Sequence, residues 1–150
     1  MPQSAEHKKI ITPSHKQLDI TRLSSIRSFV SKADVIVNFA AYTEVKSATL
    51  DAYGAAWQLN VKGASNVARV CNEGDKFLIH ISTDGVFPIT ADSRGPHTEI
   101  EKAKDNPDLV SPYGFTKLKG EIEVAKSGAR AAILRIAYPF GNALFPEKDY

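Results

Sequence analysis

Short apolar runs alternate along the chain with stretches in which apolar residues recur every three or four positions. Four runs rich in apolar and β-branched residues predict strands, at residues 9–12, 35–40, 77–81 and 132–137. Helical periodicity predicts three helices, one that begins after Thr21, one over 49–74 and one over 111–128. The runs at 35–40 and 77–81 show almost no polar alternation, which is typical of strands buried on both faces. Strands that alternate with helices predict an α/β fold, a parallel sheet with helices on both faces.

The composition narrows the class of protein. The chain has 150 residues, 43% hydrophobic and 24% charged, as in ordinary globular domains. Its net charge of +2 is too small to indicate a nucleic-acid partner or an acidic membrane surface. No apolar run approaches the ~20 residues of a membrane helix, and the polar start lacks the apolar core of a signal peptide. Because Cys71 is the only cysteine and the histidines lack metal-ligand spacing, we expect one cytoplasmic domain without a disulfide or a metal.

Tyr113 and Lys117 form the sharpest candidate for catalysis. They lie four residues apart at the start of the last predicted helix, so they share one helix face. A nearby ammonium lowers the pKa of a phenol, which lets a tyrosine exchange a proton with a substrate oxygen near neutral pH. The pair alone fits equally well an ordinary helix with an aromatic residue and a surface lysine.

Two further groups of residues follow predicted strands. Ser82 and Thr83 carry hydroxyls that can hydrogen-bond a substrate carbonyl or alkoxide. The segment from Ala40 to Thr43 begins with small residues, which let a ligand approach the backbone. Ligands of parallel α/β sheets bind at the carboxyl ends of strands, so we expect both groups near the Tyr–Lys pair. Singly, each also fits an ordinary strand end or close helix–strand packing.

Together and in this order, the motifs resemble a known family. The matching stretches are Leu18-Asp19-Ile20-Thr21, residues 34–43, Leu59-Asn60-Val61, His80-Ile81-Ser82-Thr83-Asp84-Gly85-Val86-Phe87, Ser111-Pro112-Tyr113-Gly114 with Lys117 and Gly120-Glu121, and Ile133-Leu134-Arg135. They resemble the extended short-chain dehydrogenase/reductase family, and within it the dTDP-4-dehydrorhamnose reductase group. The resemblance implies a Rossmann-like sheet and NADPH-dependent reduction of the 4-keto group of a dTDP-4-keto-6-deoxy sugar, in dTDP-L-rhamnose biosynthesis.

The resemblance also implies a role for each matching residue. Tyr113 would donate the proton to the keto oxygen, Lys117 would hold the nicotinamide ribose and lower the pKa of Tyr113, and Thr83 would hydrogen-bond the reacting oxygen. Substrate contacts would come from Ser82, Thr83 and Tyr138. Cofactor contacts would come from Asp19, Ile20, Ala40, Ala41, Tyr42, Thr43, Tyr113 and Lys117. Asn60 would be a structural helper.

The chain departs from the family pattern at both ends. The family begins with a strand and a Gly-x-x-Gly-x-x-Gly turn that holds the pyrophosphate, and this sequence contains no such turn. Residues 9–12 match the second strand of the family. We therefore expect residues 1–150 to form a partial NAD(P)-binding Rossmann domain that lacks the first strand, with the substrate domain largely absent, in a fragment or truncated reading frame.

The expected partners follow from the resemblance. Ser14, His15 and Lys16 stand where NAD-specific relatives place an acid, and such neutral and basic groups tolerate a 2′-phosphate, so we expect NADP(H), with NAD(H) as the alternative. The other expected partner is a nucleotide sugar, and a homodimer is compatible with the sequence. The alternative function is that of a non-catalytic, nucleotide-binding regulatory subunit, which resembles the beta subunit of methionine adenosyltransferase.

Overall fold

The computed structural model describes residues 9–88, 90 and 95–137. Its strands are β1 (Val35–Asn38), β2 (Phe77–Thr83) and β3 (Ala131–Ile136). Its α-helices are α1 (Leu23–Val30), α2 (Ala55–Trp57), α3 (Ala64–Glu73) and α4 (Pro112–Lys126). A π-helix, η2 (Gln58–Gly63), joins α2 to α3, and 3-10 turns occur at η1 (Val45–Ser47), η3 (Asp84–Val86) and η4 (Pro107–Leu109).

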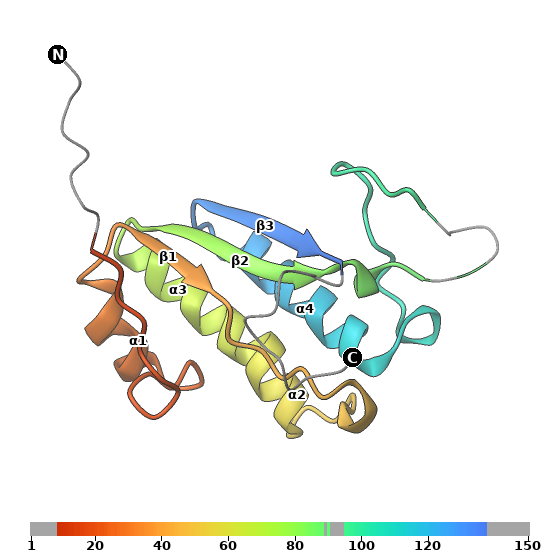
Figure 1. Ribbon diagram of the computed structural model, residues 1–150, viewed down its shortest axis with the longest axis horizontal. Helices are drawn as coiled ribbons and strands as arrows, with labels where there is room; N and C mark the ends of the chain where they lie inside the picture. Colours follow the sequence, from red (N-terminus) through yellow and green to blue (C-terminus); the bar gives the residue numbers. More distant parts are fainter. Residues whose placement is uncertain (1–8, 89, 91–94, 138–150) are drawn as a thin grey trace, which may run out of the picture.

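The three strands form one parallel sheet in the order β1-β2-β3, which confirms the predicted α/β class and the Rossmann-like arrangement. Asn38 at the end of β1 is the register partner of His80, and Thr83 at the end of β2 is the partner of Ile136. The carboxyl ends of the strands therefore meet at one edge of the sheet. Helix α3 leads into β2 and α4 leads into β3 (Figure 1).

The helices α1, α3 and α4 lie on one face of the sheet, not on both as predicted (Figure 1). Leu78, His80 and Ser82 of β2 are buried beneath these helices. On the opposite face, Val37 is 45% exposed and Ile136 is 42% exposed. For α3 and α4 the reason is topological, because right-handed crossovers between strands added in one direction place the connecting helices on the same side. Helix α1 lies there because Ile26 and Val30 pack in one cluster with α3 and Leu78. Coverage of both faces needs a reversal of strand order, which the described residues do not contain.

The prediction of a strand at residues 9–12 is wrong for this structure. These residues form no regular element, and Ile10 is 83% exposed. A strand needs a neighbour for its backbone hydrogen bonds, and in the described part of the chain β1 pairs only with β2. The free edge of β1 is therefore left without a ladder partner there.

The main core lies between the sheet and the helices. Ile26 and Val30 of α1, Val67 and Cys71 of α3, and Leu78 of β2 belong to one buried cluster. Helix α4 approaches η2 at backbone distance, because a Cβ atom on Gly120 would overlap the carbonyl oxygen of Asn60. This close approach sets the distance between α4 and the continuous helical segment formed by α2, η2 and α3.

We expect the two faces of the sheet to respond differently to substitution. Val37→Thr alters the uncovered face and should change the free energy of unfolding by less than about 0.5 kcal/mol. Leu78→Ala empties a site that is 0% exposed and should lower the free energy of unfolding by about 3 kcal/mol. Urea denaturation of the whole chain measures both. An equal loss at Val37 would mean that the second face is also covered.

We also expect Gly120→Ala to destabilise the chain by about 1–3 kcal/mol, because the added methyl group must push α4 away from the carbonyl of Asn60. Gly74→Ala is the matched control. Its Cβ would lie 3.4 Å from the nearest atom, the carbonyl oxygen of Val70, and φ at Gly74 is −97°. The midpoint of thermal unfolding should fall in Gly120→Ala and stay unchanged in Gly74→Ala. Equal midpoints in the two variants would contradict the close approach of α4 to Asn60.

Candidate active site at the carboxyl end of β2

Helix α4 begins where the sequence predicts, and its first turn is held against the end of β2. Ser111 is the N-cap, and its hydroxyl accepts the Gly114 N–H at 3.1 Å. Pro112 occupies the first turn, where its missing N–H is no loss. A Cβ atom on Gly114 would overlap the carbonyl oxygen of Gly85 in η3. Glycine at this position therefore lets Tyr113 lie beside the end of β2.

Lys117 fixes the next turn of α4 on the same strand. Its side chain is buried, and its Nζ donates a hydrogen bond to the carbonyl oxygen of Ile81 at 2.7 Å. Along the chain, Thr83 thus lies between Ile81, which accepts from Lys117, and Gly85, which contacts Gly114. Burial lowers the pKa of Lys117 to about 8, while the carboxylate of Glu121 acts in the opposite direction. The structure therefore brings the three residues predicted to be catalytic, Thr83, Tyr113 and Lys117, to one end of β2.

The hydroxyl of Thr83 takes part in a local turn. It accepts the Gly85 N–H at 3.1 Å and donates to Asp84 Oδ1 at 3.1 Å. Tyr113 is half-buried, and its pKa is raised by burial and by the negative charge of Asp84. The expectation that Lys117 lowers the pKa of Tyr113 is therefore wrong for this structure. The physical reason is that the ammonium donates to the backbone of β2, while desolvation of the phenol dominates.

Two buried asparagines hold the loop from Ala40 to Thr43 that the sequence predicts to contact a cofactor. Asn38 Oδ1 accepts the Ala40 N–H at 3.1 Å. Asn60 Oδ1 accepts the Tyr42 N–H at 2.8 Å, and Asn60 Nδ2 donates to the Tyr42 carbonyl at 3.2 Å and to Thr116 Oγ1 at 3.0 Å. Asn60 thus ties the loop to the helix that carries Tyr113 and Lys117. Ala40 and Thr43 remain exposed.

Asp19 and Ile20 lie before α1 and differ in accessibility. The carboxylate of Asp19 accepts the hydroxyl of Thr21 at 2.7 Å and its N–H at 2.9 Å, and these hydrogen bonds lower the pKa of Asp19. The side chain of Ile20 is buried in the core against Gly63. Of the two residues, only Asp19 presents its side chain to a ligand. Ser14, predicted to face the ribose, lies in an exposed turn before them.

Ser82 does not face the same way as Thr83, because successive side chains of a strand point to opposite faces. The Ser82 hydroxyl is buried and donates to Glu121 Oε1 at 2.5 Å. Arg135 of β3 completes this group through its guanidinium, at 2.7 Å from Glu121 Oε2. Glu121 and Arg135 had no role in the sequence-based prediction, although Tyr113, Lys117 and Glu121 recur every four residues on one face of α4. Tyr138 lies outside the described residues.

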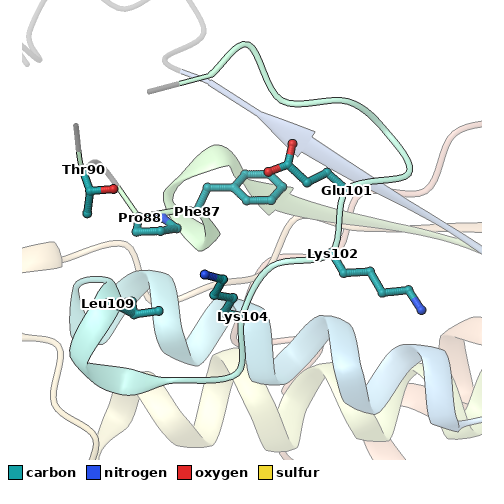
Figure 2. Close-up of a pocket in the computed structure, with 7 residues that line it drawn as sticks. All are labelled: Phe87, Pro88, Thr90, Glu101, Lys102, Lys104 and Leu109. Atoms are coloured by element: carbon teal, nitrogen blue, oxygen red, sulfur yellow. The ribbon is translucent and has the colours of Figure 1, made fainter. Parts of the chain in front are cut away.

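A pocket of ≈ 320 Å³ lies beside Phe87, at the end of η3. Figure 2 shows the side chain of Lys102 extending away from the ring of Phe87. The ring of Phe87 stacks on His97 with a centroid distance of 4.0 Å, and the guanidinium of Arg135 lies 4.9 Å from the Phe87 centroid. The pocket is lined by Phe87, Pro88, Thr90, Glu101, Lys102, Lys104 and Leu109.

Two other kinds of feature are absent from the described part of the chain. No three His, Cys, Asp or Glu side chains are grouped there so as to hold a metal ion. None of the helices described has both the length and the apolar character required to cross a bilayer.

Comparison with known proteins agrees with this arrangement. The chain is 36% identical over 137 residues to the dTDP-4-dehydrorhamnose reductase of Mycolicibacterium smegmatis, a match that covers 91% of this chain and 40% of that protein. It is also 41% identical over 88 residues to the methionine adenosyltransferase 2 subunit beta of Rattus norvegicus, which covers 59% of this chain and 24% of that protein. The chain thus spans less than half the length of these relatives.

Solved structures of dTDP-4-dehydrorhamnose reductases share the fold. The one from Clostridium acetobutylicum superposes with a TM-score of 0.77 at 31% identity, over 93% of this chain and 48% of that one. The one from Bacillus anthracis, solved in complex with NADP, gives a TM-score of 0.71 at 29% identity, over 87% of this chain and 46% of that one.

The family model described as the RmlD substrate binding domain matches residues 2–147. This match confirms the resemblance that the motifs around Thr83 and Tyr113 indicated. The chain belongs to the RmlD substrate binding domain family.

Proposed function

We propose that this chain carries the catalytic part of an NADPH-dependent reductase that converts the 4-keto group of a dTDP-4-keto-6-deoxy sugar to an alcohol. The observation that supports this proposal is the position of Thr83 between the two contacts that hold α4 on β2. Tyr113 stands at the first contact and Lys117 forms the second. The dTDP-4-dehydrorhamnose reductases among its relatives carry the same activity in their names. We propose a cytoplasmic location and a nucleotide-sugar substrate for the same reason.

The chemistry assigns one task to each side chain. Reduction of a ketone adds a hydride to the carbonyl carbon and a proton to the oxygen. Because burial and Asp84 raise the pKa of Tyr113, its phenol is protonated at neutral pH and can donate that proton. Lys117 lies one turn further along α4, where its ammonium would hold the ribose of the nicotinamide. Thr83 donates its hydroxyl hydrogen to the reacting oxygen once it leaves Asp84.

The residues around Lys117 fit the nicotinamide end of a dinucleotide. An ammonium has three N–H donors, and in the described part of the chain only one of them is used, by the carbonyl of Ile81. Two buried donors therefore remain for ribose hydroxyls. The nicotinamide supplies the hydride when it is bound. The sequence contains no Gly-x-x-Gly-x-x-Gly turn, so the pyrophosphate cradle of the family is not formed by these residues.

We propose NADP(H) as the preferred cofactor. The Bacillus anthracis relative was solved in complex with NADP. In this chain Ser14, His15 and Lys16 form an exposed turn without an acidic side chain that would repel a 2′-phosphate. In this proposal, residues 1–150 provide the cofactor-binding Rossmann part of the protein.

Tyr113→Phe should lower turnover of the keto sugar by about 10²–10⁴-fold, because it removes the proton donor. The measurement is the rate of NADPH oxidation by the longest reading frame that contains this chain. Tyr53→Phe is the matched control, because Tyr53 is almost fully exposed. Near-normal turnover in the Tyr113 variant would exclude this residue as the proton donor.

The environment of Lys117 predicts a pH dependence of stability. Its pKa is lowered from 10.5 to about 8 in the folded chain, so between these pH values the unfolded state binds more protons. The free energy of unfolding of the wild type should therefore rise across this interval relative to Lys117→Met, by up to about 3 kcal/mol. Urea denaturation of both chains at several pH values tests this. A constant difference between them would mean that Lys117 is not desolvated.

The similarity to a methionine adenosyltransferase subunit supports a second candidate, a regulatory subunit that binds a nucleotide without catalysis. Against it, Thr83, Tyr113 and Lys117 are all present. Recovery of a stoichiometric partner enzyme in a pull-down, with no turnover of keto sugar, would favour this alternative.

A further inference from the structure

His80 is a buried histidine in the central strand β2, and one of its two ring nitrogens has no hydrogen-bond partner. Its side chain is 1% exposed and lies beneath the helices. Its Nδ1 lies 3.2 Å from Asn38 Nδ2, and its Nε2 is the one buried side-chain nitrogen or oxygen in the described part of the chain that has no hydrogen-bond partner. Buried polar atoms normally have a hydrogen-bond partner, so the unpartnered nitrogen of His80 requires an explanation.

The hydrogen bonds around Asn38 determine which imidazole nitrogen carries the proton. The Ala40 N–H needs an acceptor, which must be Asn38 Oδ1 at 3.1 Å. The NH₂ group of Asn38 then faces His80 Nδ1, and a donor can bond that nitrogen only when it carries no proton. His80 is therefore neutral, with its proton on Nε2. Burial and the charge of Lys117 agree with this assignment, since they lower the pKa of His80 to about 4.

We propose that His80 is a positioning residue for the loop from Ala40 to Thr43: by accepting the Asn38 amide, it holds Asn38 Oδ1 on the N–H of Ala40. Without an acceptor at Nδ1, the NH₂ group of Asn38 would be buried without a hydrogen-bond partner. This orientation of the amide would then be destabilised. Asn60 holds Tyr42 in the same loop, so two buried amides fix the loop at two places. The consequence for cofactor affinity rests on the proposed function.

Three variants of the whole chain separate this role from general packing. His80→Leu removes the acceptor but keeps an apolar side chain of similar bulk. His80→Asn places its amide oxygen where Nδ1 stands and should restore the bond. Leu78→Val lies on the same face of β2, is equally buried, and touches neither Asn38 nor Ala40 in the hydrogen-bond network.

Two measurements are made on each variant: hydrogen exchange of the Ala40 amide by NMR, and the dissociation constant for NADPH. His80→Leu should speed exchange at Ala40 and weaken NADPH binding, each by about 5-fold, as expected for one lost hydrogen bond. His80→Asn should lie close to the wild type in both. Leu78→Val should lower stability without a specific change at Ala40.

The outcomes separate the inference from the proposed function. Equal Ala40 exchange in His80→Leu and Leu78→Val would overturn the positioning role. If the wild type binds no NADPH while Ala40 still responds to His80→Leu, the proposed function fails and the positioning role stands. A ¹⁵N spectrum of the wild-type imidazole needs no variant to fold, and a proton on Nδ1 instead of Nε2 would also overturn the inference.

Discussion

The packing of α4 directly on β2 is the constraint on which the candidate site depends. Gly114 brings the helix start against the carbonyl of Gly85, and Gly120 brings its middle against the carbonyl of Asn60. A side chain at Gly114 would move α4 away from η3, the turn that follows β2, and a side chain at Gly120 would move it away from η2. Because Tyr113 and Lys117 are carried on this helix, its distance from β2 decides whether they can act together with Thr83. The site is thus set by two places where a Cβ atom is absent.

Several buried polar side chains lie where α4 packs on the sheet and on η2, and three of them on α4 have hydrogen-bond partners there. Lys117 bonds the backbone of β2, Glu121 accepts from Ser82 and Arg135, and Thr116 accepts from Asn60. Buried charges are expensive unless they are paired, and such pairs add little to stability compared with apolar packing. What they add is direction, since each hydrogen bond is satisfied in only one placement of the helix. The helix is therefore held in register as well as in contact.

No helix of the described part of the chain covers the other face of the sheet. Strands that progress in one direction receive their crossover helices on one side, so the side chains of Val37 and Ile136 stay accessible in the described part of the chain. These strands carry apolar side chains on both faces, and this pattern favours burial of both faces. It does not specify which segment would cover them. This is why the predicted two-sided sheet and the predicted strand at 9–12 both differ from the structure.

The sequence by itself predicted the parallel α/β class, the three strands of the sheet and the start of α4 at Ser111, and it singled out Thr83, Tyr113 and Lys117 as candidate residues. These features depend on local periodicity, on caps and on motifs whose spacing is visible along the chain. Tertiary structure alone decided that Ser82 turns to Glu121 and not to a ligand, that Ile20 enters the core, and that the pKa of Tyr113 is raised. It also paired His80 with Asn38, 42 residues apart in sequence. The physical reason is that desolvation and hydrogen-bond partners come from neighbouring strands and helices, which a one-dimensional pattern does not place.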